Sequence, residues 1–304
     1  MTQPLVIQPA DPTEARGPHV AGSVRTIWIS DLHLGLSSCQ ADALLRFLKA
    51  HPAAVIVAVG DIVDLLQMRR GLRWEPVYNR LLRYLLKRVE KGVRVVYIPG
   101  NHDSAFRDLA GRTVFGIEIA HRAVYRHRDG PLLVTHGDEA DTIVRVSPWL
   151  AKVGGWGYDV LLQMNAVVAT LQRARGRRPW SLAKAVKASV KRACTYIADF
   201  EGTLAAEARA RGCVGVICGH IHHAEMREVH GVRYYNTGDW VESCTALVEH
   251  WDGTLELRHA AALAVTRGAA MSAPAAGWGW SEDDDEPDPG WPAGSSARPL
   301  LTGL

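Results

Sequence analysis

Short apolar runs recur along the chain, and most of them end in a glycine or a polar cluster. Continuous apolar runs of this length are typical of strands that are buried on both faces. We expect strands at Thr26–Ser30, Ala54–Gly60, Arg94–Gly100, Leu132–Gly137, Val214–Gly219, Val232–Gly238 and Thr245–His250.

Helical patterns lie between several of these strands, most clearly at Ala41–Lys49 and Asn79–Lys91. Alternating strands and helices indicate an α/β fold in which helical layers cover the sheets. We therefore predict one domain over residues 24–260, preceded by a disordered segment at residues 1–23.

Residues 141–211 break the alternation, because their pattern is helical apart from a basic stretch at Arg173–Pro179. We expect a helical insertion here. Apolar positions from Val160 to Leu171 form one helical face, and Lys184, Lys187 and Lys191 lie opposite the apolar side of the next helix. Such a surface suits acyl chains with an anionic head group, and an anionic membrane. A helical layer with a solvated lysine face is the alternative.

Residues 261–304 are rich in Ala, Gly, Pro and Ser and contain the acidic run Glu282–Glu286. This composition buries too little apolar surface to order a chain, so we predict a disordered tail. Its tryptophans could instead form a partner motif.

The composition is that of a globular protein, with 47% hydrophobic and 22% charged residues in a chain of 304. Lys and Arg number 35 against 32 Asp and Glu, but residues 261–304 carry a net charge of −4, so the first 260 carry +7. A basic body of this kind favours an anionic partner.

Five scattered cysteines without a CxxC pair argue against a disulfide framework and a thiolate zinc site, and favour a reducing compartment. The N-terminus has no signal-peptide pattern, and the chain has no apolar run of about 18 residues that could span a membrane. We expect a cytoplasmic protein.

Polar clusters follow five of the predicted strands. Because ligands of α/β sheets bind beyond the carboxyl ends of strands, these clusters are candidates for a single site. They are Asp31-Leu-His33, Gly60-Asp61-Ile-Val-Asp64, Gly100-Asn101-His102-Asp103, His136-Gly137-Asp138 and Gly219-His220-Ile-His222.

Each cluster alone has a plainer explanation, since Asp at a strand end often caps a helix. Together they supply Asp, His and Asn without sulfur, which suits divalent ions such as Mn²⁺, Fe or Zn²⁺. Seven candidate ligands are too many for one ion and fit two ions that share a carboxylate: Asp31, His33, Asp61, Asn101, His136, His220 and His222.

In this order the motifs resemble those of the calcineurin-like metallophosphoesterase superfamily, over roughly Thr26 to Trp251. The resemblance implies two β-sheets flanked by helices and a dinuclear metal site. By motif, one ion would be held by Asp31, His33 and His222. The other would be held by Asn101, His136 and His220, and Asp61 would bridge the two.

The resemblance also makes His102 the catalytic histidine, with Asp103 orienting it. Two such ions activate water and neutralise phosphoryl oxygens. An imidazole suits protonation of the leaving oxygen near neutral pH. Asp64 is either a group that supports this site or the start of a helix.

Within the superfamily, the chain resembles the UDP-2,3-diacylglucosamine diphosphatases of lipid A synthesis. The resemblance rests on the SDLHLG opening, the helical insertion between HGD and GHIHHAE, and the closing segment Asn236–Ser243. It implies cleavage of a lipid-linked sugar nucleotide to UMP and an acylated sugar 1-phosphate, at the cytoplasmic face of the inner membrane. The best-known members have Arg where this chain has His102.

Arg69 and Arg70 follow the predicted bridging carboxylate and could bind phosphate, or simply be solvated. Three other functions remain open: a phosphatase or phosphodiesterase with another substrate, a nuclease, and a scaffold without activity. We expect no nucleic acid partner, because no basic stacking platform interleaved with aromatic residues is visible. The sequence leaves the oligomeric state undetermined.

Overall fold

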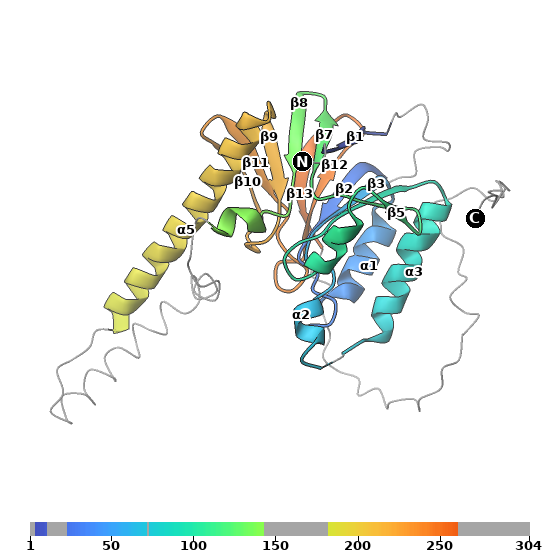
Figure 1. The fold of residues 1–304 in the computed structure, drawn as a ribbon, viewed down its shortest axis with the longest axis horizontal. Coiled ribbons are helices and arrows are strands. Elements are labelled where there is room, and N and C mark those ends of the chain that lie inside the picture. The colour runs from blue at the N-terminus through green and yellow to red at the C-terminus, as the bar shows by residue number, and fades with distance from the viewer. Residues whose placement is uncertain (1–3, 11–22, 72, 143–181, 261–304) are drawn as a thin grey trace.

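The computed structural model describes residues 4–10, 23–71, 73–142 and 182–260, with side chains of α5 described from Cys194 onward. Two mixed β-sheets lie face to face with helices on their outer sides (Figure 1). The helices are α1 (Ala41–Ala50), α2 (Leu65–Met68), α3 (Pro76–Glu90), α5 (Leu182–Ala210) and the short 3-10 helices η1 (Ser104–Leu109) and η2 (Asp138–Thr142).

The seven-stranded sheet has a parallel centre, in which β2, β3, β4 and β6 run the same way, and antiparallel edges. In spatial order its strands are β13 (Leu255–His259), β12 (Thr245–Glu249), β2 (Val24–Ile29), β3 (Ala53–Val59), β4 (Arg94–Ile98), β6 (Ile117–Ile119) and β5 (Thr113–Val114).

The six-stranded sheet also has a parallel centre, formed by β8, β9 and β11. In spatial order its strands are β1 (Leu5–Ile7), β7 (Ala123–His127), β8 (Gly130–Val134), β9 (Gly215–Cys218), β11 (Val232–Asn236) and β10 (Glu225–Val229).

Side chains alternate between two cores along the central strands, because successive residues of a strand point to opposite faces. On β3, Val55, Val57 and Val59 pack in the cluster between the two sheets, whereas Ile56 packs in the cluster beneath the helices. Both faces of the central strands are therefore apolar, which explains why they appear in the sequence as unbroken hydrophobic runs.

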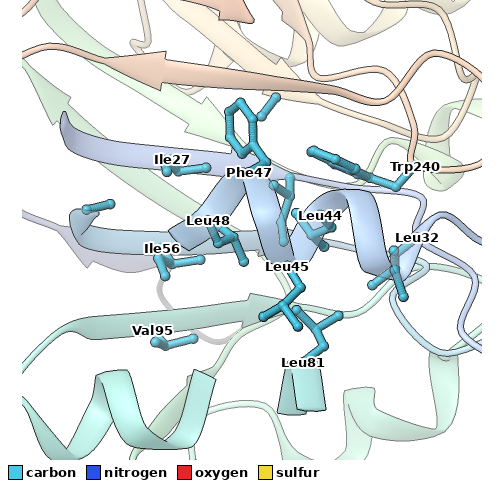
Figure 2. Packing of buried hydrophobic residues seen from close by; sticks show 14 of the residues in the cluster. Ile27, Leu32, Leu44, Leu45, Phe47, Leu48, Ile56, Leu81, Val95 and Trp240 are labelled. Atoms are coloured by element: carbon cyan, nitrogen blue, oxygen red, sulfur yellow. The ribbon is translucent and has the colours of Figure 1, made fainter. Parts of the chain in front are cut away.

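Helices α1 and α3 pack against each other and cover one face of the seven-stranded sheet. Leu44 and Leu48 of α1 lie in one buried cluster with Ile56 of the sheet and Leu81 of α3 (Figure 2). On the opposite side of the molecule, Phe200 and Leu204 of α5 pack with residues of β8, β9 and β11. Three apolar layers thus hold the two sheets and their helices together.

All seven predicted strands and both predicted helices are present, so the predicted fold class is confirmed. Six further strands were not predicted, among them β1, which lies in the segment that we expected to be disordered. That expectation was wrong for Leu5–Ile7, which pair in parallel with β7. Ile7 is fully buried between the sheets, and this burial stabilises the short edge strand.

Helix α5 lies within the predicted helical insertion, and residues 143–181 of that insertion lie outside the described residues, as does the tail at 261–304. None of the helices that the structure describes is long and apolar enough to cross a bilayer.

Leu44→Ala should lower the free energy of unfolding by about 2–5 kcal/mol, because it leaves a cavity in the α1 layer. Leu82→Ala on α3 is the matched control, since Leu44 is fully buried and Leu82 is 36% exposed. The control should cost less than about 1 kcal/mol. Chemical denaturation of both variants measures the difference, and equal losses would contradict this account of the layer.

Candidate dinuclear metal centre

The five predicted motifs meet where the carboxyl ends of strands from both sheets come together. Asp31, Asp61 and Asn101 follow β2, β3 and β4 of the seven-stranded sheet. His136 and His220 follow β8 and β9 of the six-stranded sheet. Because the sheets lie face to face, these strand ends place the polar side chains at one shared edge.

Asp31, His33 and His222 form one group whose potential ligand atoms all lie within 4.8 Å of one another. The Nε2 atom of His222 lies 3.3 Å from Oδ1 of Asp31 and 3.2 Å from Nε2 of His33. These are the three residues that the sequence predicted for one ion.

Asp61, His136 and His220 form a second such group. A single atom joins the two groups, because Oδ2 of Asp61 lies 3.3 Å from Nε2 of His136 and 3.9 Å from Nε2 of His33. The structure therefore brings Asp61 between the two groups, as expected for a shared carboxylate. Asn101 precedes His102, whose backbone N–H donates to Oδ1 of Asp61 (2.8 Å).

Several candidate ligand atoms are buried without a hydrogen-bond partner: Oδ1 of Asp31, Oδ1 of Asn101 and Nε2 of His136. A buried polar atom without a partner is costly, so each one needs an explanation. Coordination of a divalent ion would satisfy all three, and the set of carboxylate, amide and imidazole donors suits such an ion. The residues present thus fit the metal centre that the motifs predict.

The backbone around the site is strained. Eight residues other than glycine have positive φ among those that the structure describes, and five of them are candidate ligands: Asp31, His33, Asp61, His220 and His222. Left-handed conformations cost free energy for residues with a Cβ atom, and they persist where the surroundings enforce them. Here they bring side chains two positions apart in the chain, such as those of Asp31 and His33, to the same site.

Three of the motifs begin with a glycine, and the lack of a side chain at each glycine leaves room for the ligands. A Cβ atom on Gly60 would lie 2.2 Å from Nδ1 of His136, and one on Gly100 would lie 2.3 Å from Oδ1 of Asp61. At Gly219 it would lie 2.4 Å from Oδ2 of Asp31. Only glycine permits this close approach of backbone and ligand.

The charges of the site favour a cation. Burial alone would raise the pKa of Asp31, but His222, His136 and His33 outweigh burial and hold that pKa below its usual range. Conversely, burial disfavours a charged His136, yet Asp61 and Asp31 raise its pKa to about 10. Metal ions would take the place of these protons, so metal binding weakens as the pH falls.

Asp64 supports two histidines of the site. Its Oδ2 atom lies 3.1 Å from Nδ1 of His33 and 3.0 Å from Nδ1 of His102. Its Oδ1 atom accepts the backbone N–H of Gln67 (2.7 Å) and so caps α2. Both roles that the sequence left open for Asp64 are therefore present in one side chain.

The carboxylate beside His102 is that of Asp64, and our expectation that Asp103 orients His102 was wrong. Asp103 is fully buried and accepts hydrogen bonds from the backbone of Gly100 (2.6 Å) and Ile62 (2.7 Å) and from the Tyr97 hydroxyl (2.5 Å). It ties the loop after β4 to the loop after β3. The resemblance of the motif placed Asp103 beside His102, but the two side chains have different partners.

Asp141 is a further residue that the motifs did not identify. Its Oδ2 atom lies 2.6 Å from Nε2 of His220, and its Oδ1 atom accepts the hydroxyl of Tyr196 on α5 (2.6 Å). The acidic stretch after His136-Gly137 was the available signal. Nearby, Arg107 binds both oxygens of Asp138 at 2.8 Å.

The structure describes the side chains of only two of the five predicted substrate contacts. Arg69 and Arg70 are exposed just after α2. Lys184, Lys187 and Lys191 belong to α5, in the part whose side chains lie outside the description.

A family model described as calcineurin-like phosphoesterase matches residues 24–224, which is more than half of the chain. The chain belongs to the calcineurin-like phosphoesterase family. The family assignment confirms the predicted superfamily and a metal-dependent hydrolase acting on phosphoesters. A search of curated protein sequences found no match.

Solved structures similar to this calcineurin-like phosphoesterase include an archaeal phosphodiesterase (12% identity, TM-score 0.37), which covers 77% of this chain and 98% of its own. The YfcE phosphoesterase of E. coli (14%, 0.34) covers 77% and 97%. Zinc-bound Vps29 of Entamoeba histolytica (16%, 0.35) covers 77% and 96%.

Gly100→Ala should weaken metal binding at least about tenfold, because its Cβ would displace Asp61 and His136. Gly71→Ala is the matched control, since both glycines lack a positive φ and a Cβ on Gly71 meets nothing within 4 Å. Titration of the metal-free proteins with Mn²⁺ measures the effect. Wild-type affinity in Gly100→Ala would contradict the close packing described here.

Asp64→Asn should lower both metal affinity and turnover, each by about 10–100-fold, because it removes the carboxylate beside His33 and His102. Asp108→Asn on η1 is exposed and serves as the control. Mn²⁺ titration and hydrolysis of an aryl phosphodiester measure the two effects. A variant that loses stability but neither property would show that Asp64 only caps α2.

Proposed function

We propose that the chain hydrolyses the pyrophosphate of UDP-2,3-diacylglucosamine to UMP and 2,3-diacylglucosamine 1-phosphate, using two divalent ions. The observation that carries the hydrolase chemistry is the pair of ligand groups joined through Asp61. The lipid substrate is inferred from the SDLHLG opening, the insertion between HGD and GHIHHAE, and the closing segment Asn236–Ser243.

In this proposal Asp31, His33 and His222 hold one ion, and Asn101, His136 and His220 hold the other. Asp61 would be shared by both ions, and its Oδ2 atom lies near a histidine of each group. Mn²⁺ is our first expectation, with Fe or Zn²⁺ as alternatives for the same donors. When bound, such ions activate water and neutralise the charge of the phosphoryl group.

His102 then protonates the leaving oxygen. Its Nδ1 atom lies beside Asp64, so its Nε2 atom is the one left to face the substrate. The ring stands edge-on to His33 at a centroid distance of 4.7 Å, and about a third of the side chain is exposed. A half-open imidazole that lies beside a carboxylate is well placed to transfer a proton to the substrate.

The closing segment, Asn236–Ser243, contacts the end of β2 and the Asp31 backbone. The Ser30 hydroxyl contacts the Thr237 hydroxyl (2.6 Å), and the N–H of Trp240 donates to the carbonyl of Asp31 (3.0 Å). The segment therefore holds Asp31 in its strained conformation. The contacts of this segment are structural, because they support Asp31. The segment supports the lipid assignment only through the resemblance of its sequence.

The basic, amphipathic insertion supports a peripheral position at the cytoplasmic face of an anionic inner membrane. Residues 142–211 contain 12 Lys and Arg against 4 Asp and Glu, a net charge of +8. We propose that Lys184, Lys187 and Lys191 meet the anionic head group. Arg69 and Arg70, which follow the helix capped by Asp64, would then contact a phosphate.

One observation favours a second candidate, a phosphodiesterase or phosphatase with another substrate. The chain keeps a histidine at His102, which is the general pattern of the superfamily, where the best-known lipid diphosphatases have Arg. The metal centre and the role of His102 are the same in both proposals, and only the bound substrate differs.

The deciding experiment measures UMP release from UDP-2,3-diacylglucosamine with Mn²⁺, with and without EDTA, beside an aryl phosphodiester. We expect UMP release that EDTA abolishes. His102→Ala should keep both ions and lose about 10²–10⁴-fold in turnover, because it removes the general acid. The exposed His121→Ala is the control.

Hydrolysis of the aryl diester without UMP release would reject the lipid substrate and retain the metal chemistry. Full activity of His102→Ala would remove the role proposed for that residue. Steeply salt-sensitive binding to DNA would favour a nuclease instead.

A further inference from the structure

One turn of α5 reaches the metal centre. Tyr196 and Phe200 are four residues apart, so they lie on the same face of the helix. Both side chains are buried, although α5 otherwise packs on the outer face of the six-stranded sheet. This turn contacts His220 from two directions.

The first contact is a chain of two hydrogen bonds. The Tyr196 hydroxyl donates to Oδ1 of Asp141 (2.6 Å), and Oδ2 of the same carboxylate lies 2.6 Å from Nε2 of His220. A carboxylate accepts only, so Nε2 of His220 must carry the proton. The lone pair of His220 is then on Nδ1, which is the atom free to coordinate an ion.

The second contact is aromatic. The rings of Phe200 and His220 lie 5.9 Å apart at an angle of 33°. Phe200 also fills the space beside Gly137, where a Cβ atom would lie 2.8 Å from Cζ of Phe200. Gly137 directly follows His136, so the same helical turn packs against the loops that carry both histidines of the second group.

The two ligand groups have separate supports. In the first group, Nδ1 of His33 is held by Asp64, which belongs to the loop before α2. In the second, Nε2 of His220 is held by Asp141 and, through it, by α5. Carboxylates that fix a metal-binding imidazole in this way set its tautomer and orientation.

We propose that Tyr196 and Asp141 are positioning residues for the ion held by Asn101, His136 and His220, and that α5 thereby controls the affinity of this ion. The ion held by Asp31, His33 and His222 is supported instead by Asp64, so we expect α5 to affect it much less. This inference concerns the metal centre alone and does not depend on the lipid substrate.

The test is titration of metal-free protein with Mn²⁺, followed by calorimetry and by the magnetic coupling of the two ions in electron paramagnetic resonance. Tyr196→Phe and Asp141→Asn should each weaken one ion by about 10–100-fold and leave the other within about twofold. Thr203→Ala, a half-buried position of α5 whose hydroxyl donates to the carbonyl of Asp199, is the control and should bind both ions as the wild type does.

The double variant gives a readout that general destabilisation would not produce. Because both residues act through one hydrogen-bond chain, the double variant should bind the weakened ion no worse than Asp141→Asn alone. Should Asp141→Asn fail to fold, Tyr196→Phe, which removes a single hydroxyl, is sufficient for the test.

Three results would overturn the proposal. They are wild-type binding of both ions in Tyr196→Phe, equal weakening of both ions, and binding of only one ion by the wild-type protein. None of these results depends on whether UDP-2,3-diacylglucosamine is hydrolysed, so this proposal and the proposed substrate can fail separately.

Discussion

The face-to-face packing of the two sheets is the interaction on which the site depends. Asp31, His33, Asp61 and Asn101 follow strands of the seven-stranded sheet, whereas His136, His220 and His222 follow strands of the six-stranded sheet. Neither sheet alone carries a complete set of ligands for either proposed ion. The buried valines of β3 and the residues opposite them therefore determine the geometry of the site as well as the stability of the fold.

The packing also explains why the backbone at the site is unusual. Each ligand must turn away from its own strand toward a point between two sheets, and left-handed residues and glycines allow that turn. The free energy that this strain costs is offset by the apolar layers on both sides of each sheet. A rigid fold is thus a condition for placing seven polar side chains at one edge.

The strands and candidate ligands were predictable because their signals are local. An apolar run followed by Gly-Asp or Gly-His marks both the end of a strand and a ligand, as at Gly60 and Gly219. The residues that orient the ligands were harder to predict, because their roles depend on distant parts of the chain. The Asp64 carboxylate contacts His33, which lies 31 positions away in the sequence, and the Asp141 carboxylate contacts His220, 79 positions away. No spacing rule links either carboxylate to its histidine. β1 was missed for the same reason, since three residues form a strand only beside β7.

The contact between α5 and His220 has a thermodynamic consequence. Coupling between two sites is reciprocal: if the position of α5 changes the affinity for an ion, the ion must change the position of α5 by the same free energy. The hydroxyl of Tyr196, on α5, is linked to His220 through the carboxylate of Asp141 alone. In this proposal, loading of the metal centre and the position of α5 are therefore linked equilibria, and the supply of metal ions acts on the helix as an effector would.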